Sequence, residues 1–267
     1  MEIHSDFGPV LLEDGWVPAP RYLLRRKLVL ELLEGAPPGN VLEIGCGPGA
    51  LLYELSRIGW ACTALERSEH ALAIARKLHG NSEGAEIVSE AGAWECRFDW
   101  IICMEVLEHI ENDLKALTTW IKWLKPGGTL LLSVPAHMDK WCHTDEWAGH
   151  FRRYEKEELG ELLGKAGFEV RRILSYGFPV ANLLEPLRSW HHGRMINRSA
   201  GDGNSPRSKR EGTDQSGTSR SLEMRLYPIL GSPLGVAAFR LANWLQRRFL
   251  NFDLGNGYLV VAVKRDS

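Results

Sequence analysis

The chain has 267 residues, of which 44% are hydrophobic, so it can bury the core of one large domain or of one domain with an appendage. Its 32 Lys and Arg residues nearly balance its 34 Asp and Glu residues, and the formal charge of -2 excludes an overall electrostatic attraction to nucleic acid. These values favour a small-molecule or protein substrate.

The cysteines and the N-terminus indicate the compartment. The cysteines are odd in number, scattered and never spaced as C-x-x-C, which argues against a disulfide framework and against a zinc site. The first residues are acidic where a signal peptide would be basic, and no run of about 18 apolar residues is present to span a bilayer. We therefore expect a cytoplasmic protein that at most rests on a membrane surface.

Short apolar strands alternate with helical patterns over the first two thirds of the chain. This alternation predicts a mostly parallel sheet with helices on both faces. The expected strands are 41–45, 61–66, 85–89, 98–104, 129–134 and 168–175, and the expected helices are 22–34, 49–58, 68–79, 111–124 and 155–166.

The regular alternation ends near residue 177. Residues 178–192 are rich in Trp and Leu, whereas 193–221 are rich in Gly, Ser, Arg and Asp and are expected to be mobile. Apolar residues at helical spacing return over 222–250, and a last apolar strand follows at 258–264. The expected organisation is a ligand-binding domain formed by 1–177 plus 257–267, with a helical insertion at 178–256.

A glycine-rich loop follows the first predicted strand. Residues 41–49 read Val-Leu-Glu-Ile-Gly-Cys-Gly-Pro-Gly, and glycine lets the backbone bend sharply and approach a ligand just before a helix N-terminus. This pattern predicts a nucleotide cradle. The spacing of Gly45, Gly47 and Ala50 also fits the dinucleotide pattern, so an NAD-dependent oxidoreductase is an alternative.

Two acidic residues are placed where such a ligand would need them. Glu66 ends the second strand, where a doubly wound fold requires an acid to accept the ribose hydroxyls of an adenosine ligand. Glu43 lies inside the first strand, where burial of a charge is costly without a partner. A ligand ammonium or a loop N–H group is the expected partner.

Four ordered motifs carry a family resemblance. The strings are Glu43-Ile-Gly-Cys-Gly-Pro-Gly49, Ala64-Leu-Glu-Arg-Ser68, Met104-Glu-Val-Leu-Glu-His-Ile110 and Leu124-Lys-Pro-Gly-Gly128. Together they resemble the class I S-adenosylmethionine (SAM)-dependent methyltransferases, in particular the small-molecule group that includes ubiquinone and menaquinone methyltransferases. The resemblance implies an α/β Rossmann-like seven-stranded sheet, mostly parallel with the last strand antiparallel. It also implies methyl transfer from SAM to a small-molecule acceptor, as O- or C-methylation of an apolar or aromatic metabolite.

The resemblance also assigns cofactor-binding roles. The glycines would shape the loop under the methionine moiety, and acids and bases around it would bind the remaining groups. By position they are Gly45, Gly47 and Gly49 in the loop, Glu43 near the ammonium, Glu66 on the ribose, Arg67 and Glu90 at the adenine, Met104 and Glu105 on the opposite side, and Tyr22, Arg25 and Arg26 at the carboxylate end.

Acceptor-binding residues are expected in the segment after the fifth strand, because loops at the carboxyl ends of parallel strands form the ligand crevice. Its string Thr144-Asp-Glu-Trp-Ala-Gly-His-Phe-Arg-Arg-Tyr154 resembles a lid-like motif of type 11 and 12 methyltransferases. A neutral histidine could take the proton of an acceptor hydroxyl, with His150 as the first candidate base and His109 as the second. No metal is expected, because the histidine spacings match no usual zinc pattern. The substrate-binding candidates are Trp141, His143, Arg153 and Tyr154.

The insertion and the overall activity allow more than one interpretation. The two apolar arms of the insertion could cover the pocket mouth and admit an apolar or lipid-like acceptor, or they could simply pack on the sheet. A methyltransferase-like binding protein without turnover is a further alternative to an enzyme.

Overall fold

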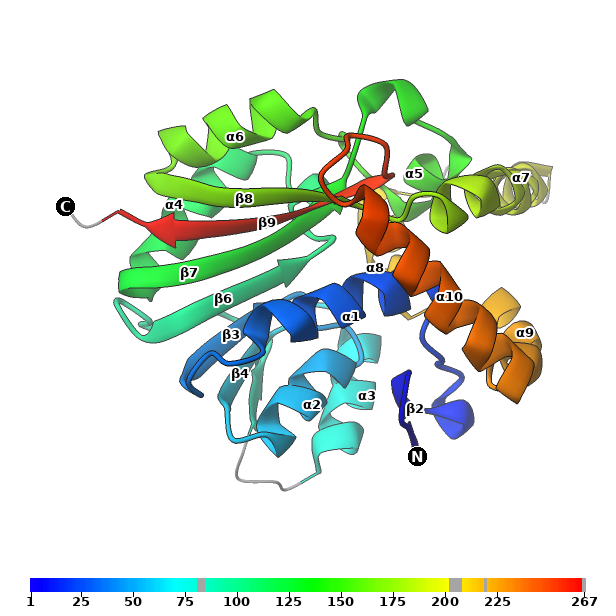
Figure 1. Cartoon of the computed structure of the whole chain (residues 1–267), viewed down its shortest axis with the longest axis horizontal. Coiled ribbons are helices and arrows are strands. Elements are labelled where there is room, and N and C mark those ends of the chain that lie inside the picture. The colour runs from blue at the N-terminus through cyan, green and yellow to red at the C-terminus, as the bar shows by residue number, and fades with distance from the viewer. Residues whose placement is uncertain (81–84, 202–207, 219, 266–267) are drawn as a thin grey trace.

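The computed structural model describes residues 1–80, 85–201, 208–218 and 220–265 (Figure 1). Its centre is a seven-stranded sheet of order β5-β4-β3-β6-β7-β9-β8. All neighbours are parallel except β9, which is antiparallel to both β7 and β8, so the predicted fold class is confirmed. The strands are β3 (Asn40–Ile44), β4 (Ala61–Leu65), β5 (Ala85–Val88), β6 (Phe98–Met104), β7 (Leu124–Pro135), β8 (Phe168–Tyr176) and β9 (Gly257–Lys264).

Helices cover both faces of this sheet, and successive residues of a strand point to opposite layers. Ile102 packs with α1, α2 and α3, whereas its neighbour Ile101 packs with α4 and α6. Both residues are fully buried, which is why the central strands read as continuous apolar runs. The helices are α1 (Pro20–Leu33), α2 (Ala50–Arg57), α3 (Glu69–His79), α4 (Asp113–Trp123) and α6 (Lys156–Lys165).

Some short elements lie outside the predicted pattern. Two three-residue strands, β1 (Glu2–His4) and β2 (Gly8–Val10), form a small antiparallel sheet, and a six-residue helix, α5 (His143–Ala148), follows β7. Elements of this length are too short for hydrophobic periodicity to reveal. The helix α5 is nevertheless important, because it carries part of the site described below.

The described part of the insertion contains four helices. They are α7 (Val180–Gly201), α8 (Lys209–Ser216), α9 (Ser221–Leu230) and α10 (Pro233–Phe249). The predicted helical stretch 222–250 is thus interrupted around Ser232, whose side chain caps α10. The described part of the segment expected to be mobile is largely helical; residues 202–207 and 219 lie outside the described residues, and the mobility stays a prediction.

The helices of the insertion pack against the domain at different places (Figure 1). Helix α10 contacts α1, whereas α7 and α8 contact α5. The α8 contact is close: a Cβ atom added at Gly212 would lie 3.0 Å from backbone atoms of Trp147, Ala148 and Gly149. A polar helix is therefore placed by backbone-to-backbone packing at a glycine. None of the described helices is long and apolar enough to cross a bilayer.

Candidate active site

The glycine loop after β3 depends on its glycines. Gly45, Gly47 and Gly49 have φ values of 69°, 54° and 76°, in the left-handed region that L side chains rarely adopt. A Cβ atom at Gly45 would lie 2.4 Å from Val106 Cγ2, whereas one at Gly47 would meet nothing within 4 Å. The loop thus packs closely against the chain after β6 and leaves open space at Gly47.

Glu66 links this loop to the end of β4. Its Oε2 accepts a hydrogen bond of 2.8 Å from the N–H of Gly47, and its Oε1 accepts bonds of 2.8 Å from the N–H groups of Arg67 and Ser68. Burial raises the pKa of Glu66, and the three backbone bonds oppose that shift. The acid is therefore held where the loops after two adjacent strands meet, as an adenosine ligand requires.

Glu43 is buried below the same loop. Its side chain belongs to β3, the residue is 5% exposed, and its Oε2 has no hydrogen-bond partner among the described residues. Burial is the main cause of the rise in the pKa of Glu43 to about 8. A cationic partner would stabilise the ionised form of this buried acid, so the site fits a ligand that carries an ammonium group.

One cavity of about 740 Å³ connects these groups, which is a usual size for a ligand pocket. Two predicted cofactor residues do not line the cavity: Gly49, which shapes the glycine loop, and Glu90, which is exposed. Ala91, next to Glu90, does line it. The role of Glu90 at the adenine stays a prediction. The predicted cofactor residues that line the cavity are Tyr22, Glu43, Gly45, Gly47, Glu66, Arg67, Met104 and Glu105.

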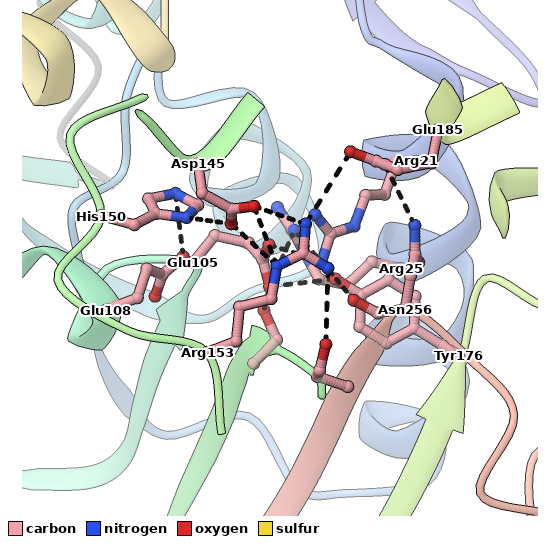
Figure 2. Close-up of polar contacts among 12 residues, drawn as sticks. Arg21, Arg25, Glu105, Glu108, Asp145, His150, Arg153, Tyr176, Glu185 and Asn256 are labelled. Atoms are coloured by element: carbon pink, nitrogen blue, oxygen red, sulfur yellow. Dashed lines mark hydrogen bonds and ion pairs between the residues drawn. The ribbon is translucent and has the colours of Figure 1, made fainter. Parts of the chain in front are cut away.

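Glu105, directly after β6, is held in an ion-pair network (Figure 2). Arg21 Nη2 lies 2.9 Å from its Oε2, and the hydroxyls of Tyr176 and Ser133 donate to its Oε1 at 3.0 and 3.1 Å. Burial opposes ionisation, but Arg21 and Arg25 outweigh it and lower the pKa of Glu105 to about 2. Glu105 is thus a fixed negative charge on the cavity wall. Sequence reasoning missed Arg21. Of the two arginines that it placed at the carboxylate end, Arg25 lines the cavity beside Glu105, and Arg26 also lines it while pairing with Glu54.

A second network, centred on Asp145 of α5, lies behind the part of the cavity wall that His150 lines (Figure 2). Arg153 donates from Nε and Nη2 to the two oxygens of Asp145, at 2.9 and 2.6 Å, and His150 Nδ1 lies 2.8 Å from Oδ1. Burial opposes ionisation, but the bonds from His150 and Arg153 lower the pKa of Asp145. Because a carboxylate only accepts hydrogen bonds, Nδ1 of His150 donates to Asp145, so in the neutral imidazole the lone pair lies on Nε2.

His109 lies beside His150 on the cavity wall. The two ring centroids are 4.7 Å apart, and both side chains line the cavity. Burial, followed by the nearby His150, lowers the pKa of His109 to about 3, so its imidazole is neutral. The structure therefore brings together the two histidines that the sequence proposed as bases.

This geometry agrees with the comparison of the sequence with known families. Residues 19–173 match the profile of a family described as "Methyltransferase domain". The chain belongs to the class I SAM-dependent methyltransferases. SAM is the methyl donor of this family, and the glycine loop, Glu66 and Glu43 form a site that fits it.

Curated relatives of the methyltransferase are ubiquinone biosynthesis O-methyltransferases. The mitochondrial enzyme of Schizosaccharomyces pombe is 34% identical over 109 residues, which cover 36% of this chain and 37% of that protein. The enzyme of Vibrio cholerae serotype O1 is 33% identical over 118 residues, which cover 42% of this chain and 48% of that protein. The matched region is thus less than half of the length of either relative.

Solved structures share the fold of the methyltransferase at low sequence identity. The [4+2]-cyclase SpnF has a TM-score of 0.58 at 17% identity, with 92% of this chain and 82% of that chain covered. A putative methyltransferase from Bacillus halodurans has a TM-score of 0.55 at 16% identity, with 90% and 99% covered. Both likenesses concern the fold alone. The family match favours a methyltransferase over the NAD-dependent oxidoreductase that the glycine spacing allowed.

The four predicted substrate-binding residues lie outside the cavity lining. Arg153 is buried against Asp145, and the hydroxyl of Tyr154 donates to Asp113 at 3.1 Å. His143 is exposed, with Nδ1 3.0 Å from a carboxylate oxygen of Glu146. Trp141 is half-buried in the loop before α5. A direct contact of these four with an acceptor stays a prediction.

Other residues line the cavity without having been predicted to do so. Thr144 and Trp147 come from α5, in the segment whose density of aromatic and charged residues already indicated the crevice. Arg188 comes from α7, and Thr213 and Arg220 come from the segment around α8. The insertion carries no recognisable motif, so only its packing on α5 could reveal these contacts.

Proposed function

We propose that the methyltransferase transfers a methyl group from SAM to a hydroxyl oxygen of a small-molecule acceptor that binds beside His109, His150 and Trp147. The observation that carries this proposal is the continuity of the cavity from the glycine loop to His150. The two curated relatives, which are ubiquinone biosynthesis O-methyltransferases, support oxygen as the attacked atom. An acidic carbon would use the same base.

The chain's own residues would hold the donor in place. SAM, when bound, supplies a methyl group on a positively charged sulfur that leaves as a neutral thioether. Glu66 would accept hydrogen bonds from the ribose hydroxyls, and Glu43 would lie nearest to the ammonium group. Because the methyl group is already activated, positioning supplies most of the catalysis, worth up to about 7–11 kcal/mol in well-oriented systems.

His150 is the group best placed to take the acceptor's proton. Its Nε2 has a free lone pair, and Asp145 would stabilise the imidazolium that forms when that atom is protonated. The ion pair between Arg153 and Asp145 keeps this carboxylate in one orientation. The acceptor oxygen would lose its proton to His150 Nε2 as its bond to the methyl carbon forms.

The cavity wall supports an apolar or aromatic acceptor. Five aromatic side chains line it beside the polar groups, and such side chains offer large flat surfaces to a ring or chain. They are Trp16, Tyr22, Trp120, Trp123 and Trp147.

Exposed apolar side chains on the insertion support a lipid-like acceptor and a peripheral membrane contact. On α7 they include Leu183, Leu187 and Trp190, at helical spacing on one face. On α10 they include Leu234 and Leu241. Co-sedimentation with anionic vesicles tests this part, and recovery of all the protein in the supernatant would contradict it.

The main test has two stages. Calorimetry with SAM and with its demethylated product tests the donor site, and absence of heat for both would overturn the proposal. Incubation with methyl-labelled SAM and a panel of phenols, amines and thiols, followed by mass detection, tests the attacked atom. Labelled methyl ethers are expected, and label found only on nitrogen or sulfur would overturn the assignment to oxygen.

A further inference from the structure

Glu108 is an unexplained acid beside the acceptor end of the cavity. Its side chain has no solvent exposure, and neither carboxylate oxygen has a hydrogen-bond partner among the described residues. His150 Nε2 lies 3.9 Å from its Oε1, which is beyond hydrogen-bond length. A buried carboxyl group without partners is costly, so its position requires an explanation.

The two histidines of the acceptor end surround this acid. Glu108, His109 and His150 each offer one ligand atom, and these atoms all lie within 4.8 Å of one another. Glu108 and His109 follow β6, whereas His150 comes from the loop after α5, so two segments far apart in sequence converge here (Figure 2). We propose that Glu108, His109 and His150 bind one divalent transition-metal cation at the acceptor end of the cavity.

Hydrogen bonds orient both histidines as metal sites require. Metal-ligating histidines usually donate the other ring N–H to a carboxylate or another acceptor, which fixes the ring and the tautomer. The Nδ1 of His150 is bonded to Asp145, so Nε2 remains as the ligand atom. The Nδ1 of His109 lies 3.0 Å from the hydroxyl oxygen of Thr213 on α8. The support around the candidate ligands is thus already in place.

The three candidate metal ligands determine which class of cation would bind. Two imidazoles and one carboxylate suit Zn²⁺, Co²⁺, Ni²⁺, Mn²⁺ or Fe²⁺, whereas Mg²⁺ and Ca²⁺ prefer oxygen ligands alone. Three protein ligands leave at least one position for an outside oxygen. Because His109 and His150 line the cavity and Glu108 lies behind them, that position faces the acceptor end.

This inference deepens the proposed function and rests on it, because the role given to the cation is to activate the acceptor's hydroxyl group. A bound cation would hold the acceptor's hydroxyl oxygen and favour its deprotonated form, with the proton released to solvent. His150 would then serve as a ligand rather than as the direct base. The cation would also compensate the charge of Glu108, which explains a buried acid whose carboxylate oxygens have no hydrogen-bond partner among the described residues.

Cobalt is the probe for the test, because Co²⁺ has visible absorption bands that report ligands directly. The full chain, stripped of metal by a chelator, is titrated with CoCl2 and followed by absorption, and the bound metal is counted by mass spectrometry after dialysis. We expect about one Co²⁺ per chain, with visible bands that ZnCl2 removes by competition. Glu108→Gln and His150→Ala should each weaken Co²⁺ binding by at least tenfold. His70→Ala and Glu161→Gln, at exposed positions on α3 and α6, should not change it.

The outcomes separate this inference from the proposed function. Circular dichroism and SAM calorimetry on each variant show whether it is folded and retains the donor site. Equal Co²⁺ binding by the original chain and by folded Glu108→Gln would overturn the metal site, as would the absence of binding. Methyl transfer to a hydroxyl by a metal-free chain would then leave the proposed function standing with His150 as the base. Tight Co²⁺ binding without any hydroxyl methylation would instead support the metal site and overturn the proposed function.

Discussion

The carboxylate of Asp145 connects His150, which lines the cavity, to Arg153, which lies behind it. Its Oδ1 lies 2.8 Å from His150 Nδ1, and its two oxygens accept hydrogen bonds from Arg153, which does not line the cavity. Arg153 therefore fixes the acid, and the acid fixes the imidazole. The lone pair at His150 Nε2 depends on this chain of contacts, whether it takes a proton or binds a cation.

Replacement of Asp145 by Asn tests this dependence. An amide can donate to Nδ1, so the tautomer with the proton on Nε2 becomes favoured and the lone pair facing the cavity is lost. We expect Asp145→Asn to lower the turnover number by about 10²- to 10⁴-fold while SAM affinity stays unchanged. Turnover and calorimetry check both quantities. Glu146→Gln is the control on the same helix, and full turnover by Asp145→Asn would contradict the assigned role of His150.

Glu66 is expected to determine SAM affinity. A hydrogen bond to a charged group is worth about 1.5–3 kcal/mol, so losing one from the ribose should weaken binding by about 10- to 100-fold. Calorimetry with SAM on Glu66→Ala measures this loss. Glu69→Gln, at an exposed position of α3, is the control. Unchanged affinity in a folded Glu66→Ala protein would show that the ribose binds elsewhere.

The donor site could be read from the sequence because its parts are local to adjacent strands. The glycine loop follows β3 and Glu66 follows β4, and these strands pair directly, so strand order alone brings loop and acid together. The continuous apolar runs carry this information, because they mark short strands that are buried on both faces of a parallel sheet. The antiparallel direction of the last strand, by contrast, was implied by the family resemblance, and β9 is antiparallel to β7.

The acceptor end could be read only in part, since its contacts are long-range. Sequence patterns singled out His109 and His150 separately, but their approach to Glu108 depends on how the loop after α5 folds back on the end of β6. The ion pair of Arg21 with Glu105 likewise spans two distant segments. Helix α8 is polar, and its place over the cavity depends on a close glycine contact that no periodicity reveals.

Alanine substitutions at two glycines with positive φ separate the cost of backbone strain from the cost of a steric clash of the added methyl group. Gly35 has a φ of 81° and open space around a Cβ atom, so Gly35→Ala should cost only the left-handed backbone penalty of about 1–2 kcal/mol. Gly45→Ala should cost more and abolish SAM binding, because its methyl group would also collide with Val106. Urea unfolding and SAM calorimetry of the two variants make the comparison. Equal losses of stability would contradict the close packing of this loop.

Glu43 should make the stability of the ligand-free protein fall as the pH rises. Its pKa is raised from 4.5 to about 8, so the folded chain keeps a proton that the unfolded chain releases between these pH values. Its contribution to the free energy of unfolding is therefore fully present below about pH 4.5 and is lost as the pH rises towards 8. The expected slope is at most about 1.4 kcal/mol per pH unit.

Urea unfolding of the original chain and of Glu43→Gln at pH 5 and pH 8 measures this loss, because glutamine does not titrate. We expect the variant to gain stability relative to the original chain between the two pH values, whereas Glu161→Gln, on the exposed face of α6, should not. Bound SAM should reduce the difference, since its ammonium group would favour the ionised acid, and calorimetry in buffers of different ionisation enthalpy should then detect release of a proton. The difference in the free energy of unfolding between Glu43→Gln and the original chain could instead be independent of pH, in both the free and the SAM-bound protein. Glu43 would then be ionised without its ligand. That result would remove the reason to place the ammonium group beside it.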